Sequence, residues 1–265
     1  MVSVLGIPLD ENSSFLRGPA AAPQKIREAF HSPSSNYYSE SGLRLNDSSL
    51  WTDRGDLEFV TGVEPFEHIT SSVRKLIADR NDKVFILGGD HSITYPVVRA
   101  VSTIHSDLTI LHIDAHADLY HDFDGNPHSH ASPFARIMEN NLATRLIQVG
   151  IRTLSMEQRE QINRFGVEVI EMKDWDESFT FELAGPVYLS LDLDAIDPAF
   201  APGVSHHEPG GFSTRQILKI LQSLDGNFVG ADLVEFNPVR DSSGITGMLT
   251  GKLFKEMLEL LLRSR

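Results

Sequence analysis

The sequence predicts an α/β fold with three layers, α/β/α, in which helices cover both faces of a mostly parallel sheet. Short runs rich in β-branched residues and leucine alternate with longer segments of helical spacing along the 265 residues. Several of the short runs are apolar at nearly every position, as in strands that are buried on both faces. Because no change of composition marks a boundary, residues 1–265 are expected to form a single domain.

The expected elements follow one another from the first residues to the last. The chain opens with an apolar strand and closes with a long amphipathic helix, and residues 31–49, rich in Ser, Asn and Tyr, are expected to form a surface loop. The strands are expected at Val2–Ile7, Val84–Leu87, Thr109–Ile113, Leu146–Ile151, Val167–Glu171, Val187–Leu193 and Phe228–Val234. The helices are expected at Ala22–Phe30, Phe66–Ala78, Tyr95–Ile104, Pro133–Asn140, Met156–Phe165, Thr214–Leu224 and Gly247–Leu262.

The composition excludes several classes of function. The chain has 23 basic and 37 acidic residues, and its formal charge of −14 argues against binding to nucleic acid or to an anionic membrane surface. It has no cysteine, which removes disulfides, thiolate catalysis, iron–sulfur clusters and thiolate zinc sites. No targeting segment is visible and no run approaches the roughly 20 apolar residues that span a bilayer, so a cytoplasmic location is expected.

Two groups of ionisable residues follow two of the expected strands. Gly88-Gly89-Asp90-His91-Ser92 follows Val84–Leu87, and its glycines allow a tight turn above the sheet edge. Asp114-Ala115-His116-Ala117-Asp118 follows Thr109–Ile113, and its ionisable residues at alternate positions can project to one side. Taken alone, the first group is explained better by an ordinary strand–turn–helix with a surface histidine. For the second group, a polar loop with three unrelated side chains is the weaker alternative.

A third group lies inside an apolar strand. Asp192 and Asp194 occupy alternate positions of Ser190-Leu191-Asp192-Leu193-Asp194-Ala195-Ile196-Asp197-Pro198. Ionised carboxylates in a core are unfavourable by several kcal/mol each unless they are paired or bind a metal. No lysine or arginine in the strand pairs with them. A metal therefore explains this pattern better than a structural role does.

The three groups together predict a metal centre with six candidate ligands: His91, Asp114, His116, Asp118, Asp192 and Asp194. Carboxylates that meet at neighbouring strand ends repel one another by roughly 4 kcal/mol for each pair at an intermediate dielectric. Two divalent cations balance the charge of four carboxylates, while the histidines bind as neutral ligands. Oxygen ligands with two imidazoles favour Mn²⁺, with Fe, Co or Ni as alternatives.

These motifs resemble the metal signatures of the ureohydrolase family, which comprises the arginases and agmatinases. The resemblance covers nearly the full length and keeps the order and spacing of the motifs. Four further stretches are similar to plant-type arginases in particular: residues 12–19, 95–101, 129–139 and 199–206. The resemblance implies an arginase-like fold and a metal-dependent amidinohydrolase, with two Mn²⁺ per chain, that releases urea from a guanidinium group.

The resemblance also assigns roles to individual residues. It implies one metal held by His91, Asp114, Asp118 and Asp192, and a second held by Asp114, His116, Asp192 and Asp194. His130 matches the family's proton-shuttling histidine, and Glu235 matches the carboxylate that binds the guanidinium. Asp118 would take part in catalysis as a metal ligand. As alternatives, Glu235 would only bind loop amides and His130 would be a structural histidine of its loop.

The substrate is expected to be a small guanidino compound, L-arginine before agmatine. Asn126 and His128 lie in the loop that meets the far end of the substrate in this family, and both can donate hydrogen bonds. Hydrolysis would yield L-ornithine and urea; the alternative is an agmatinase, which yields putrescine and urea, or an enzyme for another guanidino compound. His206 and His207 belong to a loop typical of plant arginases and have no assigned role.

Three wider alternatives stay open from the residues. They are a related metal-dependent amide deacylase, a nucleotide-binding α/β domain that uses Gly88 and Gly89, and a metal-binding protein without catalysis. The second lacks a full glycine-rich fingerprint after the first strand. No nucleic-acid or membrane partner is expected, and the family resemblance implies a homo-oligomer, a trimer or hexamer.

Overall fold

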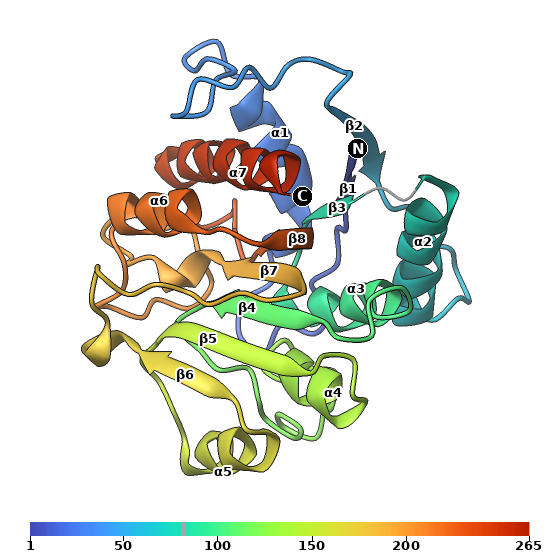
Figure 1. Ribbon diagram of the computed structural model, residues 1–265, viewed down its shortest axis with the longest axis vertical. Helices are drawn as coiled ribbons and strands as arrows, with labels where there is room; N and C mark the ends of the chain where they lie inside the picture. Colours follow the sequence, from blue (N-terminus) through green and yellow to red (C-terminus); the bar gives the residue numbers. More distant parts are fainter. Residues whose placement is uncertain (81–82, 265) are drawn as a thin grey trace.

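An eight-stranded sheet forms the centre of the molecule in the computed structural model, which describes residues 1–80 and 83–264 (Figure 1). The strand order is β2-β1-β3-β8-β7-β4-β5-β6, and every pairing is parallel. The strands are β1 (Val2–Gly6), β2 (Trp51–Asp56), β3 (Lys83–Leu87), β4 (Thr109–Ile113), β5 (Arg145–Ile151), β6 (Glu168–Glu171), β7 (Pro186–Asp192) and β8 (Asn227–Val234). This arrangement confirms the predicted α/β class and its parallel sheet.

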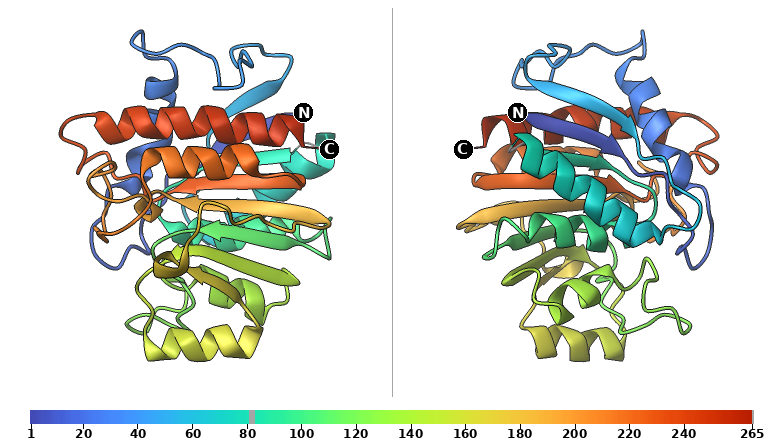
Figure 2. Two further views of the ribbon diagram at one scale, coloured as in Figure 1. Left: turned by 60° about the vertical axis from the view of Figure 1, so that its left-hand side comes forward. Right: turned by 90° about the vertical axis from the view of Figure 1, so that its right-hand side faces the viewer.

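Helices cover both faces of the sheet, as predicted (Figures 1 and 2). One face carries α1 (Ala22–Phe30), α6 (Thr214–Ser223) and α7 (Ile245–Arg263). The other carries α2 (Pro65–Arg80), α3 (Thr94–Val101), α4 (Pro133–Glu139) and α5 (Met156–Phe165). Short 3-10 turns lie at Pro19–Ala21, His91–Ile93, Met172–Asp174 and Leu193–Ala195.

The apolar runs of the sequence are strands that contribute to two cores at once. In β3, Phe85 and Leu87 face the core under α1, α6 and α7, whereas Val84 and Ile86 face the core on the opposite side. Successive side chains of a strand point to opposite faces, so a strand that is covered on both faces must be apolar at each position. The central strands show this pattern, and it explains why they could be recognised in the sequence.

Strand β2 was not predicted. Its sequence, Trp-Thr-Asp-Arg-Gly-Asp, has no apolar run because β2 is an edge strand that is largely exposed. The strand pairs with β1, and Arg27 of α1 binds the carboxylates of Asp53 and Asp56 at 2.8 and 2.5 Å. Residues outside the segment therefore hold it in the sheet. In residues 1–80 and 83–264, no helix is both long enough and apolar enough to span a membrane.

Candidate metal centre

A row of polar side chains crosses one face of the sheet between its central strands. The register pairs His112 of β4 with Ser190 of β7, and Ser190 with Asp232 of β8. Two residues further along, Asp114 and Asp192 lie on the same face at the carboxyl ends of their strands. The parallel register alone therefore brings these two carboxylates together at the edge where ligands bind in open α/β sheets.

The turn after β3 carries His91 to this edge. Gly89 is required there because a Cβ atom would lie 1.8 Å from the carbonyl oxygen of Leu9. Asp90 then begins a short 3-10 turn by accepting a hydrogen bond of 3.1 Å from the backbone N–H of Ser92. The turn is fully buried, so the His91 imidazole enters the site from a rigid support.

Three carboxylates surround the Nδ1 atom of His91. Their oxygens lie 3.3 Å (Asp114), 3.1 Å (Asp118) and 3.0 Å (Asp192) from this nitrogen. None of these contacts has the geometry of a hydrogen bond, so the buried nitrogen has no hydrogen-bond partner among the described residues. Together, the imidazole nitrogen and the three carboxylates form a suitable set of donors for a divalent cation. The residues present therefore fit a metal ion.

A second set of donors lies beside the first. His116 Nδ1 lies 3.0 Å from Asp194 Oδ2 and 3.6 Å from Asp114 Oδ1. Asp114 thus faces His91 with one carboxylate oxygen and His116 with the other. Asp192 adjoins both sets, because its Oδ1 accepts a hydrogen bond of 2.8 Å from the backbone N–H of Asp194. The structure therefore brings all six predicted ligands together.

This group of carboxylates requires added positive charge. Burial raises the pKa of Asp194 to about 6, and burial with two neighbouring carboxylates raises the pKa of Asp192 well above its usual value. Burial alone lowers the pKa of His91 and of His116, but the carboxylates outweigh burial and raise both. Within the described part of the chain, no lysine or arginine forms an ion pair with the group. Protons or metal ions must therefore balance it.

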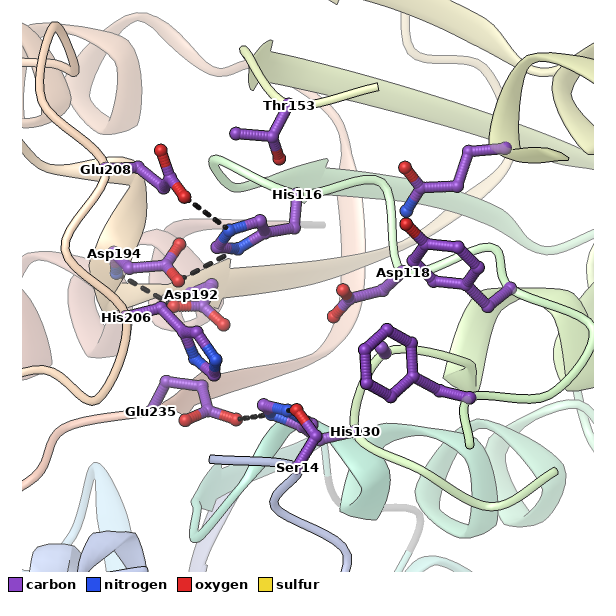
Figure 3. A pocket seen from close by; sticks show the side chains of 14 residues that line it. Ser14, His116, Asp118, His130, Thr153, Asp192, Asp194, His206, Glu208 and Glu235 are labelled. Carbon is purple, nitrogen blue, oxygen red and sulfur yellow. Dashed lines mark hydrogen bonds and ion pairs between the residues drawn. The ribbon is translucent and has the colours of Figure 1, made fainter. Parts of the chain in front are cut away.

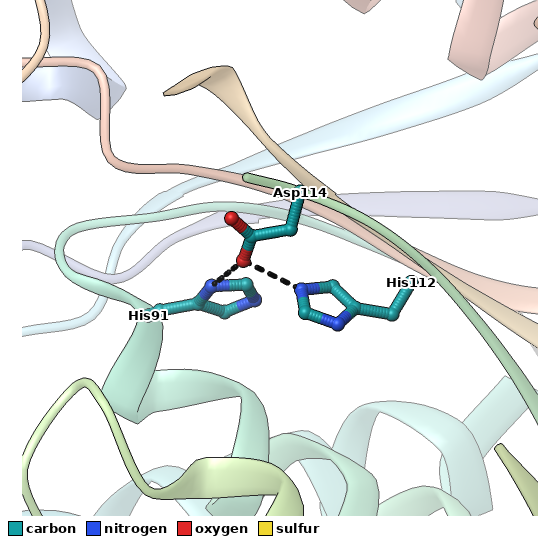
Figure 4. A group of neighbouring side chains, drawn as sticks. All are labelled: His91, His112 and Asp114. Carbon is teal, nitrogen blue, oxygen red and sulfur yellow. Dashed lines mark hydrogen bonds and ion pairs between the residues drawn. The ribbon is translucent and has the colours of Figure 1, made fainter. Parts of the chain in front are cut away.

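The buried imidazole of His112, which lies outside the three predicted groups, holds Asp114 in place (Figure 4). His112 Nε2 lies 2.7 Å from Asp114 Oδ2. The side-chain N–H groups of Gln148 donate to the carbonyl oxygen of Ala117 at 2.6 Å and to His112 Nδ1 at 3.0 Å. His112 Nδ1 is therefore the acceptor, and Nε2 carries the proton that is donated to Asp114. The sequence signal that could have revealed His112 is its position inside an apolar strand, two residues before Asp114.

His130 and Glu235 form an ion pair next to the metal ligands (Figure 3). Glu235 Oε1 accepts hydrogen bonds from His130 Nδ1 at 2.8 Å and from the backbone N–H of His91 at 2.9 Å. Burial opposes the charge on the imidazole, but Glu235 outweighs it and raises the pKa of His130 to about 9. Glu235 and Asp118 both have left-handed backbones, with φ of 64° and 50°, which is uncommon for residues with side chains and clusters at functional sites.

A cavity of about 200 Å³ opens onto the two donor sets (Figure 3). Its walls combine ligand candidates with neutral polar and aromatic side chains. The lining residues are Ser14, His116, Asp118, Tyr120, Phe123, His130, Ala131, Thr153, Gln158, Asp192, Asp194, His206, Glu208 and Glu235. The cavity thus offers room for a small molecule directly above the carboxylates.

The remaining candidate residues lie in different places. Asn126 and His128 are outside the cavity lining: the Asn126 side chain accepts from the His128 backbone N–H at 2.9 Å, and the exposed His128 ring stacks on Tyr95. A role for them in binding stays a prediction. His206 lines the cavity, with its ring centroid 5.3 Å from that of His130. His207 is exposed, and its Nε2 lies 2.8 Å from a backbone carbonyl oxygen.

Comparison with known proteins agrees with this geometry. A family model described as Arginase family matches residues 1–259. Arginase 1, mitochondrial, of Arabidopsis thaliana is 49% identical over 96% of this chain and 79% of that protein. The solved arginase from Medicago truncatula has a TM-score of 0.91 and 45% identity over 98% of this chain and 87% of its own. An agmatinase of Halalkalibacterium halodurans is 34% identical over 96% of this chain and 90% of that protein.

The comparison corrects one expectation. The sequence favoured a cytoplasmic location because no targeting segment was visible. The similar arginase of Arabidopsis thaliana is named a mitochondrial protein. This name points to an organelle, so the cytoplasmic expectation is wrong.

Proposed function

We propose that this chain, which belongs to the arginase family, hydrolyses the guanidinium group of L-arginine to L-ornithine and urea. Arginine is favoured over agmatine because the identity is 49% to the plant arginase and 34% to the agmatinase. Hydrolysis of agmatine to putrescine and urea, or of another guanidino compound, is the second candidate. The observation that carries the proposal is the group of six neighbouring ligand candidates, four of which line the cavity.

The proposal includes two divalent metal ions, preferably Mn²⁺, because carboxylate oxygens with one imidazole at each site suit that ion. One would be held by His91, Asp114, Asp118 and Asp192, and the other by Asp114, His116, Asp192 and Asp194. When bound, two such ions supply the nucleophile by lowering the pKa of a water molecule toward neutrality. His112 would fix the orientation of Asp114, one of the two carboxylates assigned to both ions.

Glu235 is suited to bind the guanidinium cation. Its Oε1 is occupied by His91 and His130, and no hydrogen bond among the described residues occupies its Oε2. That oxygen can accept an N–H of the guanidinium and orient its carbon above the ligand carboxylates. The carboxylates around it also attract the cation. Glu235 would therefore act by binding and orientation.

His130 is suited to deliver the proton that the departing amine needs. With a pKa of about 9, its imidazole is protonated at neutral pH. Its Nδ1–H points to Glu235, beside which the substrate's reacting group would lie. The proton of Nδ1 would pass to the departing nitrogen, and the ring would return to its neutral form.

The far end of the substrate would meet the neutral part of the cavity. Tyr120, Phe123, Thr153 and Gln158 line this part. No lysine or arginine lines the cavity among the described residues, so an α-carboxylate would be bound by neutral donors. Discrimination between arginine and agmatine would therefore depend on hydrogen bonds, with the Asn126–His128 loop as the predicted contributor.

Urea release from a panel of guanidino compounds tests the proposal. Metal-stripped protein is reloaded with Mn²⁺ and offered L-arginine, agmatine and 4-guanidinobutyrate. We expect release from L-arginine with about two Mn²⁺ bound per chain, and loss of turnover with fewer bound ions in Asp118→Ala. Release from agmatine alone would favour the second candidate, and no release from any compound would refute a ureohydrolase. A trimer or hexamer stays a prediction that sedimentation can test.

A further inference from the structure

A buried carboxylate that the proposed mechanism does not use is linked to the candidate ligand His91. Asp232 of β8 is inaccessible to solvent, and three hydroxyl groups donate hydrogen bonds to it. Its Oδ1 accepts from Ser190 Oγ at 2.6 Å, and its Oδ2 accepts from Thr94 Oγ1 at 2.8 Å and from the Tyr188 hydroxyl at 2.9 Å. Burial raises the pKa of Asp232, whereas the charge of His91 and these three hydrogen bonds lower it. The hydroxyl groups thus compensate a carboxylate that has no access to water.

The Ser190 hydroxyl connects this carboxylate to the imidazole of His91. Ser190 Oγ lies 2.9 Å from His91 Nε2, while Nδ1 of the same ring faces the carboxylates of the candidate ligands. A hydroxyl group can donate or accept, but its single proton is used here by Asp232, because a carboxylate is a stronger acceptor than a neutral imidazole nitrogen. The Ser190 oxygen therefore accepts a hydrogen bond from Nε2–H of His91.

The fold holds the Asp232–Ser190–His91 network in place. The register of β7 and β8 places Ser190 directly opposite Asp232. His91 begins the 3-10 turn His91–Ile93, and its backbone N–H donates to Glu235 Oε1 at 2.9 Å. The side chains of all three members are buried with no exposed surface, so water does not compete for their hydrogen bonds.

We propose that Asp232 is a positioning residue for His91 and that it acts through the Ser190 hydroxyl. This inference rests on the proposed function, in which Nδ1 of His91 binds a metal ion. Once Nδ1 is used in this way, the remaining ring proton is on Nε2, and its hydrogen bond to Ser190 fixes the orientation of the ring toward the metal. The same hydrogen bond makes Nδ1 a stronger electron-pair donor. Asp232 supports this hydrogen bond because it directs the Ser190 proton away from the ring.

A purely structural role for Asp232 leads to a different expectation. If the carboxylate only compensated buried hydroxyl groups, loss of the Ser190 hydroxyl and loss of the Tyr188 hydroxyl would affect metal binding alike. In the proposed network, only the Ser190 hydroxyl contacts His91, although both hydroxyl groups donate to the same carboxylate. Tyr188→Phe is therefore the matched control for Ser190→Ala.

Calorimetric titration of metal-stripped protein with Mn²⁺ tests the inference without turnover. We expect Ser190→Ala to weaken one of the two sites about 10-fold, as is typical when a partner of a ligating histidine is lost, and to leave the other site within about twofold of wild type. His91→Ala, which removes the imidazole itself, should abolish the same site and so identifies it. Tyr188→Phe should bind Mn²⁺ at both sites within about twofold of wild type. Urea unfolding of the stripped proteins shows that the variants are folded.

Asp232→Asn, made with and without the Ser190 hydroxyl, shows whether Asp232 acts through it. We expect Asp232→Asn alone to weaken the His91 site about 10-fold, and to have less than about a twofold further effect in Ser190→Ala. Losses that add up in the double variant would show that the carboxylate acts by its charge alone and would overturn the inference. Wild-type Mn²⁺ affinity in Ser190→Ala, or an equal loss in Tyr188→Phe, would also overturn it. A wild type that binds no Mn²⁺ would instead refute the proposed metal centre.

Discussion

Glu235→Gln should remove most of the pH dependence that the His130–Glu235 ion pair gives to stability. The pKa of His130 is about 9 in the folded protein against 6.5 ordinarily, a difference of 2.5 units. At 1.36 kcal/mol per unit, the raised pKa corresponds to about 3 kcal/mol. Because the pKa is raised, this stability is fully present below pH 6.5 and is lost as the pH rises through 9. The glutamine side chain is isosteric and can still accept the hydrogen bond from the His91 backbone.

Urea unfolding at about pH 6 and about pH 10 measures this effect. Metal-stripped proteins are compared, so that pH-dependent metal binding does not contribute, and other titrating groups cancel in the difference between variant and wild type. We expect Glu235→Gln to be less stable at pH 6, with the difference shrinking by about 3 kcal/mol at pH 10. Glu160→Gln, an exposed residue of α5, should show the same difference at both pH values. A difference for Glu235→Gln that does not change with pH would refute the reasoning.

Three further predictions concern the metal, the buried imidazole of His112 and helix α7. Metal-stripped protein should lose stability as the pH rises, because the carboxylates raise the pKa of His91 and of His116 well above 6.5. The stability from these protons is fully present below pH 6.5 and is lost as the pH rises through the raised pKa values. Thermal melts of stripped and Mn²⁺-loaded protein check this, and equal pH slopes would contradict it. His112→Phe keeps a packed ring but removes the donor to the shared carboxylate, so Mn²⁺ should bind about 10-fold more weakly in calorimetric titration; wild-type affinity would show that the donor is dispensable. In α7, Gly247→Ala meets only contacts of 3.4 Å or more and should stabilise the protein by about 0.5–1 kcal/mol, whereas the new Cβ in Gly251→Ala would lie 2.9 Å from an alanine of α1 and should destabilise it. Urea unfolding of both variants is the measurement, and effects of the same sign would be inconsistent with this packing.

The sequence was most informative where burial on both faces imposed a local pattern. The central strands could be predicted because each position had to be apolar, and Asp192 was conspicuous because it broke that pattern. Strand β2 gave no such signal, since Trp51–Asp56 lies at an edge and obtains its place from β1 and from Arg27. A strand whose place in the sheet depends on partners elsewhere in the chain has no signal in its own six residues.

The residues of the candidate site likewise include some that the sequence predicts and others that it does not. Its six proposed ligands stood out because ionisable side chains at strand ends need compensation, which is a property of the residues themselves. His112 did not stand out, because its function depends on a hydrogen bond to Asp114 and on the amide of Gln148, 36 residues away. Asn126 and His128 are outside the cavity lining, and the Asn126 side chain binds the His128 backbone and the Asn12 side chain.

The sequence by itself determined which atoms are available to this protein: carboxylates and imidazoles without thiols, at or just beyond the ends of buried strands. Of the six proposed ligands only Asp192 lies within a strand, and the turns that follow the strands orient the others. The tertiary structure alone decided which of these atoms meet. Ser14 reaches His130 across 116 residues, and Asp114 shares a face with Asp192 because β4 pairs with β7 in one register. Strand order and register are set by packing over the whole chain, and therefore no local pattern records them.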